Sequence, residues 1–302
     1  MKSKIVLPAF AIMSLSFLTI GQEKLETPIK RITVHDIYIS TGTINNRVAR
    51  GTYDDFKALA PQSDLLNQGE FNFSQSGGYS YNGNSTIAIM LGLKFSDKEK
   101  SNYKLNPVLR LGFNYSNGTN LSTGGYKETR EPFDTLISSQ TGQATYIDSV
   151  FTENYGANYS TDQLSIVGSL IFSTDPEARW SLYSGIGIAA GISLNSNTHI
   201  YYSTDRYQET LFDNSNGSGY GNSYGSSTET EHETITNKTS FGGMAYIPLG
   251  IDFRIANRSE FWKRVHVFYE IKPGLGFTSI PELNTIVNTN FQQGFGLRVT
   301  FD

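Results

Sequence analysis

The chain has 302 residues, of which 17 % are charged, 13 % are aromatic and 29 are glycine. This composition is rich in Gly, Tyr, Ser, Thr and Asn and poor in helix formers, which excludes an all-helical protein. The chain contains no cysteine, which excludes disulfide frameworks, thiolate zinc sites and cysteine nucleophiles. The net charge of −4 provides no basic surface for nucleic acid.

The first residues have the three parts of a secretory signal peptide. Two early lysines precede an apolar run over 5–18, and small residues at 19 and 21 precede a cleavage site. The run is shorter than the ~20 residues that a spanning helix needs, and no later stretch is long enough either. We therefore expect a signal peptide at 1–21, a short periplasmic linker at 22–29, and membrane insertion through strands.

Eight segments after the linker alternate apolar with small or polar residues, as membrane-spanning strands do. In one of them, Ile87 and Ile89 on one face alternate with Ala88 and Met90 on the other. In chain order the segments are 30–41, 86–95, 108–115, 163–172, 180–194, 241–254, 265–277 and 291–301. The first mixes polar and apolar residues on both faces. It is needed because seven strands would leave an open edge in lipid.

Two prolines interrupt this strand pattern. Pro248 and Pro273 lie inside predicted strands, although a closed ring has no free edge for a missing N–H. We expect a β-bulge at each of them.

The connections between the segments alternate in length. The short ones are 96–105, 174–179 and 256–264, the long ones are 42–84, 117–161 and 195–240, and 278–290 is intermediate. Outer-membrane barrels have short periplasmic turns and long extracellular loops. The pattern predicts an all-β fold, an eight-stranded antiparallel up-and-down transmembrane β-barrel over 30–302. The aromatics Trp180, Trp262 and Phe301 lie beside short turns, where we expect one membrane interface.

Two of the long loops have patterns of their own. The flanks of 195–240 alternate Thr and Tyr around a Gly/Ser/Asn/Tyr centre, which predicts strands that continue above the membrane. Such a tyrosine-rich composition is typical of recognition surfaces, and flexible cover is the alternative. Residues 53–68 predict a short amphipathic helix that Pro61 ends. Its apolar residues are Phe56, Leu59, Leu65 and Leu66, and capping the barrel mouth and docking a partner are both open roles.

The closing segment GFGLRVTFD, together with the signal peptide and the strand pattern, resembles the outer-membrane β-barrel proteins of Gram-negative bacteria. The residues similar to the family's terminal-strand signal are Gly294, Phe295, Leu297, Val299 and Phe301. The family's last residue is aromatic, whereas Asp302 follows here. The resemblance covers about 30–302 and implies a small, porin-like barrel exposed at the cell surface. It also implies two kinds of partner, the outer-membrane lipid and, during biogenesis, the barrel assembly machinery.

Charged residues collect on the faces predicted to line the lumen. An eight-stranded barrel is just wide enough for its side chains to fill the interior. The predicted lumen residues are Arg110, Asp252, Arg254, His266, Glu270, Lys272 and Arg298, together with Lys94. We interpret them as an ion network that plugs the barrel, with an excess of bases around two acids. A proton- or ion-conducting path is the alternative. Glu270 should be ionised and within reach of Arg110, Arg254 or Arg298.

The residues do not predict catalysis, although outer-membrane barrels include lipid A deacylases, palmitoyl transferases, phospholipases and proteases. Catalysis of this kind needs a nucleophile beside a base, and His266 has no Ser two residues away. His35 and Asp36 are strand neighbours, so they should point to opposite sides and not cooperate. Glu231 and His232 fit a solvent-exposed segment of alternating charged residues better than a cation-binding site. We predict no enzyme, no catalytic residue, no cofactor and no metal.

The predicted function is a structural or binding component of the outer membrane, either at the cell surface or as an accessory subunit of a larger complex. A protein partner or surface ligand would bind at the long loops. The alternatives are a narrow transporter for a small or hydrophobic solute and a lipid-modifying enzyme. The sequence names no ligand and no oligomeric state, and it leaves the roles of 42–84, 117–161 and 195–240 open.

Overall fold

The computed structural model describes residues 31–68, 81–96, 107–175, 178–212, 219–256 and 259–301. Residues 32–302 form one compact unit, and the features below belong to it. The predicted signal peptide (1–21) and linker (22–29) lie outside the described residues. No helix in the described ranges has the length and hydropathy to cross a membrane.

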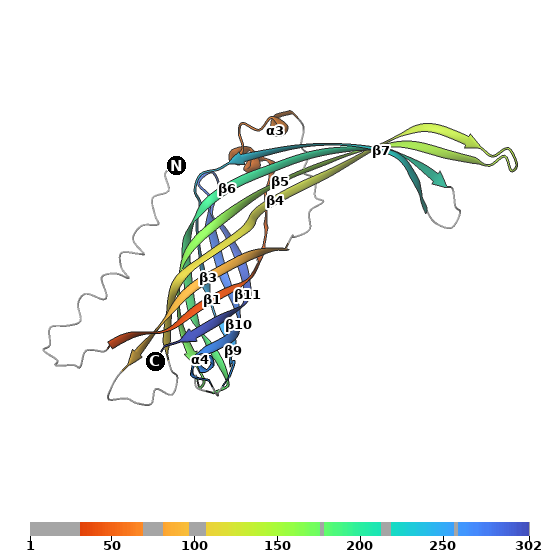
Figure 1. The fold of residues 1–302 in the computed structure, drawn as a ribbon. Helices are drawn as coiled ribbons and strands as arrows, with labels where there is room; N and C mark the ends of the chain where they lie inside the picture. Colours follow the sequence, from red (N-terminus) through yellow and green to blue (C-terminus); the bar gives the residue numbers. More distant parts are fainter. Residues whose placement is uncertain are drawn as a thin grey trace. The chain divides into compact units, whose positions relative to one another are not determined.

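Eight strands of the described part close into a ring (Figure 1). They are β1 (Arg31–Arg47), β3 (Tyr81–Ser96), β4 (Val108–Ile137), β5 (Ala144–Ser173), β6 (Trp180–Phe212), the two-part strand β8 (Phe241–Tyr246) and β9 (Leu249–Arg254), β10 (Val265–Ser279) and β11 (Ile286–Thr300). Each strand pairs with the next along the chain, and β11 also pairs with β1, which closes the ring. The predicted eight-stranded up-and-down barrel is confirmed.

The expectation of bulges at the two prolines is wrong. Pro248 lies in a two-residue gap between β8 and β9, and Tyr246 and Leu249 on either side pair with β6 residues that are also three apart. Pro273 keeps the β10–β11 register without a shift. Each proline therefore leaves a hydrogen bond out of the ladder but does not add an extra, bulged residue to the strand. The N–H of Ile247 donates to the carbonyl of Pro273 across this gap (3.0 Å).

The ring has an apolar outer surface and a polar interior. Outward-facing Ile188, Ile166 and Phe295 are 69 %, 64 % and 61 % exposed, whereas the neighbouring inward-facing Ser165 and Gly296 are buried. A soluble protein would bury such a belt of large aliphatic and aromatic side chains. Apolar residues outside and polar residues inside, alternating along each strand, are the pattern of a barrel in lipid.

Strands β4, β5 and β6 continue beyond the ring and are joined there by β7 (Gly219–Thr236), as Figure 1 shows. We call this part the sheet extension. One row across it is Lys127–Glu153–Thr204–Glu229. The β4–β5 hairpin turns at 138–143, where Gly142 has a φ of 70°, a conformation that favours glycine.

The sheet extension changes the interpretation of two predicted loops. The strands expected within 195–240 are confirmed as the outer parts of β6 and β7. Most of 117–161, expected to be a loop, is also strand. Most of its residues are polar, so it lacks the continuous apolar–polar alternation by which lipid-facing strands are identified.

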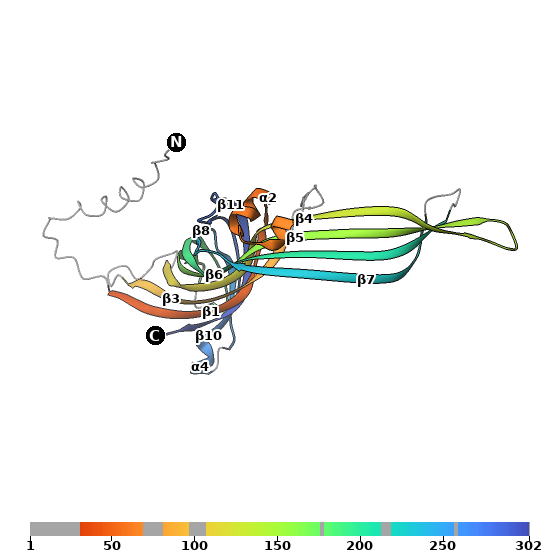
Figure 2. The same ribbon diagram turned by 90° about the horizontal axis from the view of Figure 1, so that it is seen from above.

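Two short helices pack on the sheet extension where it leaves the ring (Figure 2). Helix α2 (Tyr53–Leu59) begins at a capping box formed by Thr52 and Asp55, and α3 (Asp64–Gln68) follows Pro61. Their buried residues Phe56, Leu59, Leu65 and Leu66 contact Leu121, Ala157, Tyr159, Ile200, Ile235 and Ile280. The predicted apolar side is therefore confirmed. The other elements are β2 (Ala49–Arg50), parallel to β4, and α4 (Glu260–Lys263) in a short turn.

Candidate functional site

The lumen contains a buried ion cluster near the middle of the ring. Alternation along β4 and β10 turns Arg110 and Glu270 inward, where both are at most 4 % exposed. Arg110 Nη1 lies 2.6 Å from Glu270 Oε2, and Lys272 Nζ lies 3.0 Å from Glu270 Oε1. Buried charges are tolerated when they are paired in this way. We call these three residues the Glu270 cluster.

Aromatic rings surround the guanidinium of Arg110. Its Cζ lies 4.2 Å from the centre of the Tyr38 ring, 4.6 Å from that of Tyr183 and 5.9 Å from that of Phe268. Tyr38 and Phe268 also pack edge to face at 5.8 Å. Cation–π contacts of this kind strengthen when water is excluded. The rings and the cluster therefore lie at the same level of the lumen.

A second ion cluster lies closer to the short turns. His266 Nδ1 is 2.5 Å and Arg298 Nη2 is 3.0 Å from the same oxygen of Asp252. Asp36, fully buried on β1, lies 3.7 Å from Arg298 Nη1. If the Nδ1–H of His266 donates to Asp252, His266 and Arg298 share one carboxylate oxygen as acceptor. We call these four residues the Asp252 cluster.

Two expectations about these residues are wrong. His35 Nδ1 lies 3.0 Å from Asp36 Oδ2, although the two residues are strand neighbours. Alternation governs the Cα–Cβ directions, but the imidazole of His35 is long enough to reach the carboxylate of Asp36 past the strand backbone. The expectation of only two acids is also wrong, because Asp36 joins Asp252 and Glu270 as a third carboxylate in the two clusters. Asp36 could have been found from the alternation Asp36–Tyr38–Ser40 against Ile37–Ile39.

The remaining predicted residues lie at the short-turn end of the barrel. Arg254 pairs in register with His266 and, like Lys94, lines a pocket at this end. Trp180 is 59 % exposed and its ring lies 4.3 Å from that of Phe253. Trp262 and Phe301 are 46 % and 40 % exposed. The structure therefore puts all three predicted interface aromatics at this end, on the outer surface.

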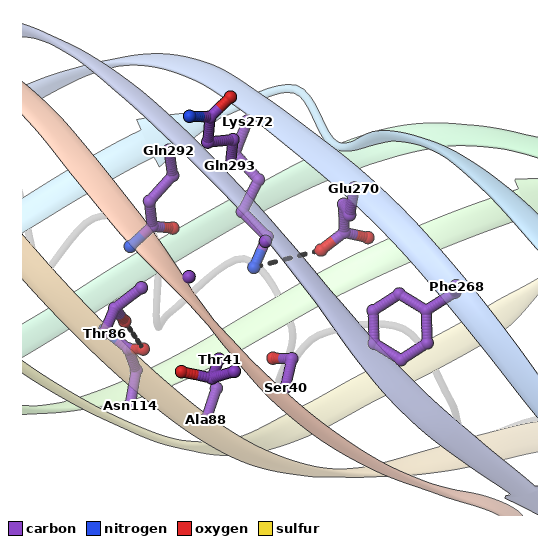
Figure 3. Close-up of a pocket in the computed structure, with 12 residues that line it drawn as sticks. Ser40, Thr41, Thr86, Ala88, Asn114, Phe268, Glu270, Lys272, Gln292 and Gln293 are labelled. Carbon is purple, nitrogen blue, oxygen red and sulfur yellow. Dashed lines mark hydrogen bonds and ion pairs between the residues drawn. The ribbon is translucent and has the colours of Figure 1, made fainter.

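Neutral polar side chains line the lumen on the long-loop side of the Glu270 cluster (Figure 3). Thr86 Oγ1 donates to Asn114 Oδ1 at 2.5 Å, and Gln292 faces them from β11. The cavity beyond them is lined by Asn120 and Gln163, among others, and has a volume of about 70 Å³.

The helices α2 and α3 are fastened to the sheet extension by polar contacts as well as by their apolar core. Glu233 on β7 accepts hydrogen bonds from Ser63 Oγ (2.5 Å) and from the N–H of Leu65 (3.0 Å) at the start of α3. The side-chain amide of Asn237 donates to the carbonyl of Leu59 (2.6 Å). We call α2, α3 and the apolar core beneath them the lid.

The inner face of the sheet extension carries a tyrosine–carboxylate group outside the lid. The rings of Tyr155 and Tyr202 stack with centres 4.8 Å apart, and both hydroxyls donate to Glu153 (2.7 and 3.1 Å). Lys127 Nζ lies 3.2 Å from the other oxygen of Glu153. Burial opposes ionisation of Glu153, but the hydrogen bonds from Tyr155, Lys127 and Tyr202 outweigh it and lower its pKa.

The outer face of the sheet extension has a second group of this kind. Tyr126 donates to Glu128 at 2.5 Å, which raises the pKa of Tyr126 to about 12. Arg130 bridges Glu128 and Glu209 at 2.5 and 2.6 Å. Both faces are thus tied across strands by charged and tyrosine side chains.

The lowered pKa of Glu153 makes the sheet extension sensitive to acid. A carboxyl whose pKa is lower in the folded state stabilises that state above its unfolded pKa, and the contribution disappears as the pH falls through the folded value. Glu153→Gln should therefore lower the melting temperature of the sheet extension at pH 7, as followed by the near-ultraviolet circular dichroism of its tyrosines. The difference from the parent should vanish at low pH. Glu131→Gln, at an exposed position of the same sheet, should change nothing, and equal effects of both variants would contradict the assignment.

No family model and no curated protein matches the chain. Among solved structures, it is similar to Neisserial surface protein A at 11 % identity, over 90 % of this chain and 100 % of that chain, with a TM-score of 0.32. It is also similar to the attachment invasion locus protein Ail of Yersinia pestis, solved with the heparin analogue sucrose octasulfate, at 12 % identity, over 88 % and 99 % of the two chains, with a TM-score of 0.24.

The class of the protein follows from its own geometry. A closed ring of eight strands with an apolar outer belt and a polar lumen is an outer-membrane β-barrel. The chain is therefore a small outer-membrane β-barrel, and its strands cross the membrane.

Proposed function

We propose that this protein is a surface-binding barrel. The ring anchors the chain in the outer membrane, and the sheet extension binds a macromolecular partner outside the cell. The observation that carries this proposal is that ring strands continue outward as one four-stranded sheet. A barrel that served only as a membrane plug would have no use for strands of about 30 residues, because ~9–11 residues cross a bilayer.

The filled lumen supports binding over transport. The Glu270 cluster and the rings around Arg110 occupy the middle of the ring, and the Asp252 cluster lies on its short-turn side. On the long-loop side, the remaining cavity has a volume of about 70 Å³. The lid adds an apolar core at that mouth.

The far end of the sheet extension carries exposed apolar side chains. Phe133, Leu136, Ile137 and Tyr146 are 58 %, 54 %, 70 % and 55 % exposed. They lie close together on the β4–β5 hairpin, since Leu136 and Ile137 pair with residues just before Tyr146. Exposed apolar patches of this kind mark interaction sites. We propose this hairpin end as the first contact with the partner.

We expect the purified full chain to give no unitary conductance in planar bilayers. The ion clusters keep the lumen closed at low voltage, so current should stay at the baseline of protein-free bilayers, while a general porin inserted in the same way should conduct. A reproducible step current from the folded chain would contradict the proposal and favour the narrow transporter.

Site-specific photocrosslinking in intact cells tests the binding role. A photoreactive residue at Tyr146, at the hairpin end, should give crosslinks to a macromolecule outside the barrel. The same residue at Ile188, which is 69 % exposed on the belt, should crosslink to lipid only. Crosslinks to protein or glycan from Ile188 but none from Tyr146 would contradict the proposal.

A further inference from the structure

The outer face of the sheet extension contains a patch without charged side chains. Alternation along the strands puts every second row of residues on this face, opposite the lid. The row that contains Glu128 and Asp205 marks the far end of the patch. From the ring outward, three successive rows before it are Ser122–Asn158–His199–Thr234, Gly124–Gly156–Tyr201–His232 and Tyr126–Asn154–Ser203–Thr230. They contain no Asp, Glu, Lys or Arg, and we call them the neutral patch.

A tyrosine ring lies over a glycine at the centre of the neutral patch. A Cβ atom added at Gly156 would overlap Cε1, Cζ and Oη of Tyr201, so this ring rests against the backbone of β5. Tyr201 is nevertheless 40 % exposed, which leaves the opposite face of the ring open to solvent. Tyr126, two strands away on β4, is 45 % exposed. At ~4.8 Å between strands, the two tyrosines present aromatic surface about 10 Å apart.

Unused hydrogen-bonding groups lie beside these two rings. The side chains of Asn154, Asn158 and Ser203 are half-buried and make no hydrogen bond with any residue that the structure describes. Asn154 lies on β5, next to Tyr126 on β4, and Ser203 follows Tyr201 on the same face of β6. Each amide offers two donors and a carbonyl acceptor, and each hydroxyl both donates and accepts. The neutral patch therefore combines open aromatic faces with free, uncharged donors and acceptors.

We propose that the neutral patch binds an uncharged glycan. The face of an aromatic ring carries a partial negative charge, which attracts the polarised C–H groups of a sugar ring. The hydroxyl groups of the sugar can exchange hydrogen bonds with the amides and hydroxyls of the patch. No cation in the patch would attract an acidic saccharide or a phosphate. This inference rests on the proposed function, because it needs the sheet extension outside the cell, and it names the chemical class of the partner.

The size of the neutral patch favours a glycan over a protein. Rows on one face are two residues apart, or about 6.8 Å, and neighbouring strands are about 4.8 Å apart. Three rows on four strands therefore cover roughly 400 Å², whereas a stable protein interface buries about 800 Å² on each partner. An area of this size suits a few sugar units that lie flat on the sheet.

The first measurement is binding of the full chain, in phosphatidylcholine nanodiscs, to an array of uncharged and acidic glycans. Nanodiscs are needed because the sugar head group of a maltoside detergent would compete. We expect uncharged saccharides to bind, and titration of the best of them gives a Kd. Tyr201→Leu should weaken this binding by about tenfold or more, because the ring on which the sugar packs is lost.

The control makes the same change outside the patch. Tyr269→Leu removes a tyrosine of the belt that is 46 % exposed, and it should leave the Kd unchanged. The heat-dependent mobility shift on a denaturing gel checks that each variant is folded. If Tyr201→Leu does not fold, Asn154→Ala still decides the question, because this side chain makes no hydrogen bond within the described residues. Asn154→Ala should weaken binding by about fivefold.

Three results would overturn the proposal. They are that no uncharged glycan binds, that only acidic glycans bind, or that the parent, Tyr201→Leu and Asn154→Ala bind equally. The proposed function fails or stands separately, since it depends on crosslinks from Tyr146 in intact cells. Crosslinks from Tyr146 to a protein, without glycan binding in nanodiscs, would overturn this inference and leave the surface-binding role intact.

Discussion

Glu270→Gln should lower the free energy of unfolding of the barrel by about 3–5 kcal/mol, since it leaves two buried or half-buried cations without their carboxylate. Glu270 is 4 % exposed and holds both Arg110 and Lys272. The variant should still insert, because the apolar belt is unchanged. The measurement is the midpoint of urea unfolding in detergent micelles, followed by the gel mobility shift.

The control for this variant is a carboxylate outside the lumen. Glu260→Gln, 82 % exposed, should leave the unfolding midpoint within error. In a double-mutant cycle, adding Arg110→Met to Glu270→Gln should cost less than the sum of the two single changes, because the pair is removed together. If Glu270→Gln and a charge on the belt, Tyr269→Asp, were both harmless, the inside–outside assignment would be wrong.

Phe56→Ala should open the lid. Phe56 has no exposed surface and lies at the centre of the lid's apolar core, and truncating such a side chain costs about 3–5 kcal/mol. The lid contains only two short helices, so we expect the loss to appear as local opening while the ring stays folded. A single cysteine introduced by Ala157→Cys reports this opening, because Ala157 is 1 % exposed beneath the lid and the chain has no other cysteine.

Labelling of that cysteine by a water-soluble maleimide should become at least about 100-fold faster in the Phe56→Ala background. Lys57→Ala, on the exposed side of the same helix, should leave the labelling rate unchanged. Equal rates in the parent and both variants would show that the lid does not control access to this surface. The same assay on Glu233→Gln measures how much the polar fastening of α3 contributes.

The sequence predicted the elements whose pattern is local. Apolar residues such as Ile87 and Ile89 alternate with small or polar residues along each strand. This two-residue period is imposed directly, because lipid contacts one face of the strand and the narrow lumen contacts the other. The first lid helix was predictable for the same reason, since Phe56 and Leu59 recur at helical spacing before Pro61, whereas the second helix, Asp64–Gln68, was not predicted as a separate element. Which residues face the lumen follows from the period.

The sequence could not determine which lumen residues meet. The partners Arg110 and Glu270 are 160 positions apart, and Asp36 joins Arg298 from the opposite end of the chain. Their contact depends on the stagger between strands, which alternation along one strand does not encode. Side-chain reach matters as well, since the ring of His35 meets Asp36 although their Cβ atoms point apart.

By itself, the sequence determined that the chain forms a ring of strands with an apolar belt and a polar lumen. Each strand carries this information in its own residues, because it needs apolar side chains toward lipid and small or polar side chains toward the lumen. Only the tertiary structure decided how far β4, β5, β6 and β7 extend beyond the ring, how three acids and three bases pair, and which cations gather at the short-turn mouth. Outside the membrane, the strands have no lipid on one face, so nothing imposes an apolar–polar alternation on their sequence. Their pairing there depends on cross-strand contacts such as Glu153 with Tyr155, Tyr202 and Lys127, which exist only once the strands are side by side.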